Sequence, residues 1–122
     1  MKITPSLEDY LKTILELNER GEARVTGLSD RLGVTKATVS QTVKKLIKFG
    51  LLEKDAHGSL LLTDLGKAKA IQVRKRNLVI KGILIEVFGV DGKVSEKDAC
   101  KIEHLISLET LEKLQGYLQK TK

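Results

Sequence analysis

The sequence predicts a mainly α-helical fold with one small β-hairpin, divided between two domains over residues 1–76 and 77–122. Apolar residues recur at helical spacing through most of the chain, and two short apolar-bearing runs surround a single glycine-containing turn. The length of 122 residues suits one domain or two small lobes. A hydrophobic content of 41% beside 31% charged residues excludes a disordered chain.

The first helix is expected to begin at Thr4 as the N-cap, with Pro5 at the first helical position, and to end at Gly21. Thr26 is expected to cap a short second helix that ends at Gly33. The chain therefore starts with two helices separated by a short loop.

A helix-turn-helix and a hairpin follow one another in the first domain. Thr35 is predicted to cap a longer helix through Lys48, and the turn over 31–35 leaves room for about three residues between the two helices. The apolar-bearing runs over 51–54 and 59–62 then predict a β-hairpin. Together these elements make a winged helix-turn-helix.

Three helices are expected in the rest of the chain. The first runs from its cap Thr63 to about Phe88 and holds Gly82 in its interior, where close packing is expected. Ser95 and Ser107 are predicted to cap the other two. One apolar stripe of the last helix could face a second copy of the chain or the core of its own chain: Leu108, Leu111, Leu114 and Leu118, with Tyr117.

The net charge of +6 lies in the first domain. Residues 1–76 carry 15 Lys and Arg against 9 Asp and Glu, whereas residues 77–122 carry seven of each kind. This imbalance is typical of a module that binds a polyanion, joined to a domain for assembly or sensing.

The helix capped by Thr35 has the side chains of a recognition helix for double-stranded DNA. Gln41 could bond an adenine edge and Ala37 could touch a thymine methyl group in the major groove, while lysines further along reach phosphates. The predicted DNA-binding residues of this helix and the wing are Thr35, Lys36, Ala37, Thr38, Ser40, Gln41, Lys44, Lys45, Lys54 and His57.

A second set of residues could bind a metal ion. Cys100, Glu103 and His104 are spaced i, i+3 and i+4, which places a thiolate, a carboxylate and an imidazole on one face of a helix. Divalent transition metals accept all three as ligands. The alternative is that Cys100 is a small buried hydrophobic residue and that His104 binds no metal.

Three stretches resemble signature stretches of one family. They are TPSLEDYL at 4–11, VSQTVKKL at 39–46 and ACKIEHLIS at 99–107, and they resemble the diphtheria-toxin-repressor and manganese-transport-regulator family of metalloregulators. The resemblance covers nearly the whole chain. It implies a homodimeric, metal-activated transcriptional repressor that binds a palindromic operator, in the short form without the SH3-like domain.

The resemblance also implies a ligand set. Asp9 matches the aspartate ligand of manganese-type members, Cys100 the cysteine of iron-type members, and Glu103 and His104 ligands of both types. The other ligand positions of the family hold Lys12, Asn77 and Lys81. We therefore expect one ion per subunit, Fe²⁺ or Mn²⁺, with Co²⁺, Ni²⁺ or Zn²⁺ able to substitute in vitro.

The substitution at Lys12 suggests a further hypothesis. The Lys12 ammonium, one helical turn from Asp9, could partly replace the charge of a second ion. The alternative is that the Lys12 side chain extends into solvent.

Three other functions are weighed against metal-dependent repression. A metal-independent winged-helix regulator with a degenerate metal site would bind DNA fully in chelator. A protein-interaction module would show no salt-dependent DNA binding. An enzyme is not expected, because Cys100 and His104 lack a third orienting group and the sequence has neither a P-loop nor a GxGxxG motif.

The sequence favours a cytoplasmic location. The single cysteine suits a reducing compartment, and the N-terminus lacks the order of a signal peptide. The longest apolar stretch, 78–90, is interrupted by Lys81 and Glu86 and is too short to span a bilayer.

Overall fold

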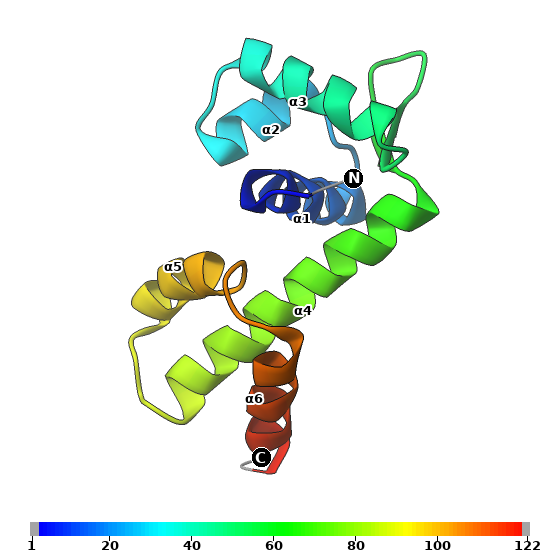
Figure 1. Ribbon diagram of the computed structural model, residues 1–122. Helices are drawn as coiled ribbons and strands as arrows, with labels where there is room; N and C mark the ends of the chain where they lie inside the picture. Colours follow the sequence, from blue (N-terminus) through cyan, green and yellow to red (C-terminus); the bar gives the residue numbers. More distant parts are fainter. Residues whose placement is uncertain (1–2, 121–122) are drawn as a thin grey trace. The chain divides into compact units, whose positions relative to one another are not determined.

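A computed structural model describes residues 3–120 of the chain. The chain splits into two compact units, Met1–Gln72 and Val73–Lys122. The described residues form six helices and one antiparallel sheet, in the order α1 (Pro5–Arg20), α2 (Val25–Leu32), α3 (Lys36–Lys48), β1 (Leu52–Lys54), β2 (Leu60–Leu62), α4 (Asp64–Glu86), α5 (Gly92–Ile102) and α6 (Leu108–Lys120) (Figure 1). The predicted fold class is confirmed. The outermost residues of both predicted domains, 1–2 and 121–122, lie outside the described part.

The first helix forms where the sequence predicts it. Thr4 accepts a hydrogen bond from the backbone N–H of Leu7 at 3.2 Å, Pro5 occupies the first turn, and Gly21 follows the last residue with φ +140°. This helix supplies much of the core of the first unit through Leu7, Tyr10, Leu11, Ile14 and Leu15, which are all buried.

The second helix begins one position before the predicted cap. Arg24 is the N-cap, so Thr26 lies inside α2 and the prediction of Thr26 as the cap is wrong. The Arg24 carbonyl already accepts the first helical hydrogen bond, from Leu28 N–H at 3.0 Å, and leaves no capping role for a later hydroxyl. Gly33 in the left-handed conformation ends α2, and Thr35 caps α3 as predicted.

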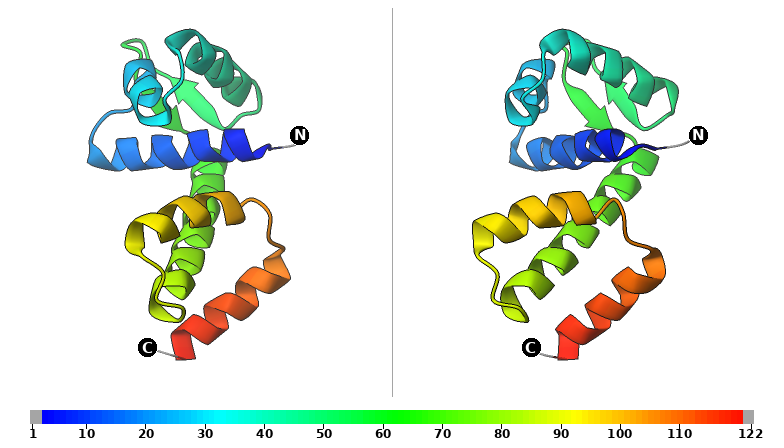
Figure 2. Two further views of the ribbon diagram at one scale, coloured as in Figure 1. Left: turned by 90° about the vertical axis from the view of Figure 1, so that its left-hand side faces the viewer. Right: turned by 60° about the vertical axis from the view of Figure 1, so that its left-hand side comes forward.

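The hairpin is confirmed and is attached to the α1–α2 loop. Its strands pair with the register Leu52↔Leu62 and Lys54↔Leu60. The outer side of β2 is also bound, because Leu60 N–H donates to the Ala23 carbonyl at 2.8 Å and Asn18 Nδ2 donates to the Leu60 carbonyl at 2.9 Å. Figure 2 shows the strands beside α3 in this unit.

The start of α4 is fixed against the base of the hairpin. Thr63 caps α4 as predicted, accepting from Gly66 N–H at 3.1 Å and donating to the Gly50 carbonyl at 2.7 Å. A Cβ atom on Gly66 would lie 1.9 Å from the backbone oxygen of Leu51. Only glycine therefore permits this approach of helix to hairpin.

In the second unit, α4 is continuous to Glu86 and contacts α6 at Gly82. A Cβ atom on Gly82 would lie 2.9 Å from Leu118 Cδ2, so the expected close packing occurs there, against a side chain. The apolar stripe of α6 is divided between the core and the surface. Leu111 and Leu118 are buried, whereas Leu108 is 66% exposed and Tyr117 54% exposed.

One cap in this unit differs from the prediction. Asp91 is the N-cap of α5, and its Oδ2 accepts from the N–H groups of Lys93 and Val94. Ser95 lies inside α5, fully buried, and donates to the Val90 carbonyl, so its prediction as a cap is wrong. A carboxylate one turn earlier satisfies the helix start. Ser107 caps α6 as predicted.

No helix within residues 3–120 combines the length and the apolar character that a membrane span requires.

Candidate nucleic-acid interface and metal-binding residues

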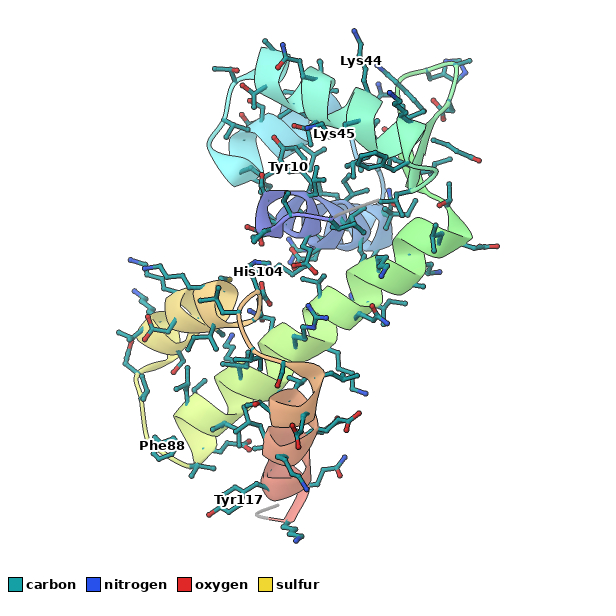
Figure 3. All side chains as sticks on the ribbon, viewed as in Figure 1. Tyr10, Lys44, Lys45, Phe88, His104 and Tyr117 are labelled. Atoms are coloured by element: carbon teal, nitrogen blue, oxygen red, sulfur yellow. The ribbon has the colours of Figure 1, made fainter. Side chains whose placement is uncertain are left out.

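The helix α3 has one buried and one exposed face. Val39, Val43 and Leu46 pack into the core of the first unit. The predicted DNA-binding residues of the helix and its cap are exposed, apart from the half-buried Ser40: Thr35, Lys36, Ala37, Thr38, Gln41, Lys44 and Lys45. Lys44 extends outward from the unit (Figure 3). A polar, basic surface thus covers the outer side of α3.

Two of the predicted hydroxyl groups also hold the start of this helix. Thr35 Oγ1 accepts from Thr38 N–H at 3.1 Å and lies 2.8 Å from Thr38 Oγ1. These threonines therefore have a structural role whatever they contact. Lys36, Ala37 and Gln41 are exposed, and their side chains take no part in the bonds between Thr35 and Thr38.

The wing presents its predicted residues at the tip of the hairpin. Lys54 ends β1 and His57 lies in the turn, and both are exposed. Asp55 Oδ1 fixes the turn by accepting from the N–H groups of His57 and Ser59, each at 2.9 Å. These bonds to the charged carboxylate, the one from Ser59 foremost, lower the pKa of Asp55 below its ordinary value.

A network that no sequence pattern indicated joins the turn to the loop before α2. Arg24 donates through Nη1 to the His57 carbonyl at 2.6 Å and through Nη2 to Glu22 Oε1 at 2.9 Å. Ser59 Oγ donates to the same Glu22 oxygen. The hydrogen bond from Arg24, followed by the one from Ser59, lowers the pKa of Glu22.

Acid is expected to loosen this turn. Because the folded pKa of Asp55 is depressed, its contribution to stability is present above the ordinary pKa of 3.8 and is lost as the pH falls through the lower folded value. Asp55→Asn should therefore lower the urea midpoint at about pH 7, and the difference from wild type should shrink below about pH 3. Asp30→Asn, on the exposed side of α2, controls for the loss of one charge. An equal difference in urea midpoint between Asp55→Asn and wild type at neutral and at acid pH would contradict a depressed pKa of Asp55 in the folded protein.

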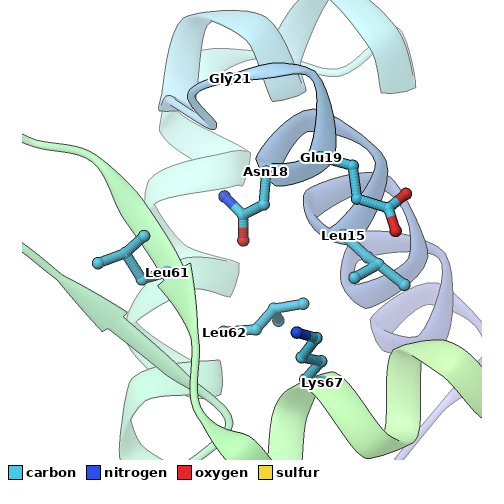
Figure 4. Close-up of a pocket in the computed structure, with 7 residues that line it drawn as sticks. All are labelled: Leu15, Asn18, Glu19, Gly21, Leu61, Leu62 and Lys67. Carbon is cyan, nitrogen blue, oxygen red and sulfur yellow. The ribbon is translucent and has the colours of Figure 1, made fainter.

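A hollow in the first unit lies between the end of α1, β2 and the start of α4. Its lining residues are Leu15, Asn18, Glu19, Gly21, Leu61, Leu62 and Lys67 (Figure 4). None of the predicted site residues lines it. The Asn18 side chain there is already bonded to the hairpin, which gives this surface a role in holding the fold.

The predicted metal ligands of the second unit do not share one helical face. The helix α5 ends at Ile102, so Glu103 is its C-cap and His104 follows in a turn. The expectation that all three lie on a helix is therefore wrong for Glu103 and His104, which lie one and two residues beyond the last helical residue. Glu103 still has helical dihedral angles and donates its N–H to the Ala99 carbonyl at 2.9 Å, after which the chain leaves the helix.

Glu103 and His104 form a buried acid–imidazole pair. The Glu103 side chain is fully buried, and its Oε1 lies 3.4 Å from His104 Nε2. A buried carboxylate is costly unless positive charge compensates it, and both groups are ligands for divalent ions. The donors present in this pair therefore fit a metal ion.

Cys100 has different surroundings. Within residues 3–120, Cys100 does not join Glu103 and His104 in a group whose ligand atoms lie within 4.8 Å of one another. The half-buried thiol instead lies 3.6 Å from Asn77 Nδ2 of α4. In the first unit, Asp9 is half-buried on α1, and its backbone carbonyl accepts from Thr13 Oγ1 at 2.8 Å. Lys12 and Lys81 are also half-buried.

A winged helix-turn-helix joined to a helical unit that carries metal-ligand side chains defines a regulator of the winged-helix class. Residues 2–59 match the family model for the N-terminal DNA binding domain of iron dependent repressors, and residues 63–122 match that for the metal binding and dimerisation domain. The chain belongs to the iron dependent repressor family.

Individual relatives agree with this assignment. The chain is 32% identical over 122 residues to an uncharacterized HTH-type transcriptional regulator of Methanocaldococcus jannaschii, covering 98% of both chains. It is 35% identical over 115 residues to the transcriptional regulator MntR of Escherichia coli O157:H7, covering 93% of this chain and 74% of that one. The solved structure of the manganese regulator SloR matches with a TM-score of 0.83 and 29% identity, over 98% of this chain and 55% of that one. The chain thus spans about half the length of that structure.

Proposed function

We propose that this chain is a metal-dependent transcriptional repressor, located in the cytoplasm, that binds a palindromic DNA operator as a homodimer. The observation that carries the proposal is the pairing of two features. The exposed basic face of α3 lies in the region matched by the DNA binding domain, and the buried Glu103–His104 pair lies in the region matched by the metal binding domain.

In this proposal α3 enters the major groove. Gln41 and Ala37 read base edges, which their exposed positions on α3 permit. Lys44 and Lys45 neutralise phosphates, and the wing residues Lys54 and His57 reach the backbone beside the groove.

Removing the two α3 lysines tests the DNA surface. Lys44→Gln/Lys45→Gln should weaken DNA binding, and the slope of log affinity against log salt should fall by about 0.9 for each phosphate that the variant no longer neutralises. Fluorescence anisotropy over a salt series measures both. The control, Lys93→Gln/Lys97→Gln on the exposed side of α5, changes the net charge equally. Equal slopes for both double variants would place the DNA surface elsewhere.

The proposed effector is one Fe²⁺ or Mn²⁺ ion per subunit. Glu103 and His104 would hold it in the second unit, Asp9 is the ligand proposed from the first, and Cys100 is a fourth candidate. A bound ion supplies positive charge and a link between its ligands. Carboxylate and imidazole donors suit manganese and iron, whereas a thiolate would favour softer ions. Similarity to the solved structure of the manganese regulator SloR supports manganese.

The match of residues 63–122 to a metal binding and dimerisation domain supports the proposed homodimer. Large apolar side chains of this unit that are exposed in the single chain are candidates for the interface: Phe88, Leu105, Leu108 and Tyr117. A two-fold dimer would present its two α3 helices to the half-sites of a palindrome.

A second candidate function is metal-independent repression. Lys12, Asn77 and Lys81 at family ligand positions, and the separation of Cys100 from the Glu103–His104 pair, favour it. If repression is metal-independent, DNA binding should be equally tight in chelator and in the presence of metal.

A further inference from the structure

We propose that Arg24 is a positioning residue for DNA binding, because it clamps the tip of the wing to the loop before α2 and so fixes where Lys54 and His57 meet the DNA. The proposal rests on the DNA-binding function proposed above. It gives a role to a charged side chain that lies outside both predicted sets of site residues.

The wing needs a clamp because it is short. Its strands have three residues each, and a two-stranded hairpin is at best marginally stable by itself. The turn end of β2 is held by Ala23 and Asn18 through the bonds to Leu60, which pairs with Lys54. Beyond Leu60, the connection from the turn to the rest of the unit passes through Arg24 and Glu22.

The guanidinium of Arg24 binds two partners at once. One nitrogen donates to the His57 carbonyl at 2.6 Å and another to Glu22 Oε1 at 2.9 Å, while Glu22 also accepts from Ser59. The clamp therefore contacts the turn on both sides of Gly58. Charge-assisted hydrogen bonds of this kind are shorter and stronger than neutral ones.

The shape of the turn matches the guanidinium. Gly58 has φ +88°, and a Cβ atom there would lie 3.2 Å from Arg24 Nη1. The Arg24 nitrogen thus packs directly on the glycine backbone. A lysine has one ammonium on a flexible stem and cannot reproduce the two-pronged contact, so charge alone is not enough at this position.

The competing explanation is that Arg24 contacts a phosphate itself. Its side chain is 46% exposed, which permits such a contact. The two roles differ in one respect: a clamp acts only through the wing, whereas a phosphate contact acts whether or not the wing binds.

A double-mutant cycle separates them, with DNA affinity measured by anisotropy on the intact protein. Arg24→Gln should weaken binding by about 5- to 10-fold, and Arg24→Lys should not restore it. In a background of Lys54→Gln/His57→Gln, the effect of Arg24→Gln should fall below about 2-fold. The control is Arg31→Gln, which removes another arginine–glutamate pair of this unit, Arg31–Glu16 at 2.6 Å, and should change binding by less than about 2-fold.

Amide exchange of the protein without DNA gives an independent measurement. Arg24→Gln should speed exchange at the His57 and Ser59 amides by about 10-fold while leaving α3 unchanged. Full rescue by Arg24→Lys, or an undiminished effect in the wing background, would overturn the positioning role. If the wild type binds DNA but Arg24→Gln leaves exchange at the His57 and Ser59 amides unchanged, the clamp is contradicted while the proposed DNA-binding function stands. Absence of DNA binding by the wild type, with the exchange effect present, would contradict the proposed function and the positioning role with it.

Discussion

Replacing Gly66 by alanine is expected to destabilise the first unit by about 3 kcal/mol. The added methyl carbon would lie 1.9 Å from the backbone oxygen of Leu51. Backbone cannot rotate away as a side chain can, so the start of α4 would have to move. That movement would strain the bonds from Thr63 to Gly50 and from Thr63 N–H to Leu51.

Helix propensity and the contact with Leu51 act on the stability of Gly66→Ala in opposite directions. Alanine is favoured over glycine inside a helix by about 1 kcal/mol, so helix propensity alone predicts stabilisation. Gly27→Ala on α2 is the matched control, because its Cβ would meet only Leu17 Cδ1 at 3.9 Å. Urea unfolding followed by circular dichroism compares the two variants. A Gly66→Ala protein as stable as Gly27→Ala would show that α4 does not approach the hairpin as described.

The substitution His104→Ala is expected to lower metal affinity by at least about 10- to 100-fold. That is the loss typical when a group beside the ligands of a metal site is replaced. His104 Nε2 lies beside the buried Glu103 carboxylate, and both are predicted ligands. Glu103→Gln keeps the size of the buried side chain and removes its charge, so it should weaken metal binding as well.

Isothermal titration calorimetry measures the Mn²⁺ affinity of His104→Ala and Glu103→Gln against that of the wild type. The control is His57→Gln, which removes the other histidine of the chain, on the exposed wing. Circular dichroism confirms that each variant is folded. Wild-type metal affinity in His104→Ala would remove this pair from the site.

The sequence predicted the elements well where signals are local. The predicted caps that are confirmed each accept a hydrogen bond from the backbone N–H three residues on: Thr4, Thr35, Thr63 and Ser107. The predictions of Thr26 and Ser95 as caps are wrong for one shared reason. In each case an earlier residue already starts the helix, and a later hydroxyl has no N–H group left to cap.

Contacts between distant residues explain what the sequence could not show. Asp55 and Gly58 have the spacing of turn residues and could have been identified as such. Arg24 binds a backbone carbonyl 33 residues away, for which no residue pattern exists. Gly66 is required by the Leu51 backbone, whereas the sequence drew attention to Gly82. The spacing of Cys100, Glu103 and His104 is that of one helical face. In the structure, however, α5 ends at Ile102, so only Cys100 lies within the helix.

A divalent ion is expected to act as the effector for DNA binding by this chain. Fluorescence anisotropy on DNA from the region upstream of its own gene tests it, first in chelator and then with Mn²⁺ or anaerobic Fe²⁺. We expect binding to be at least about 10-fold tighter with metal, and we expect the variant Glu103→Ala/His104→Ala to lose this gain. Binding that is equally tight in chelator would contradict it, and would leave a winged-helix regulator whose DNA affinity does not depend on metal.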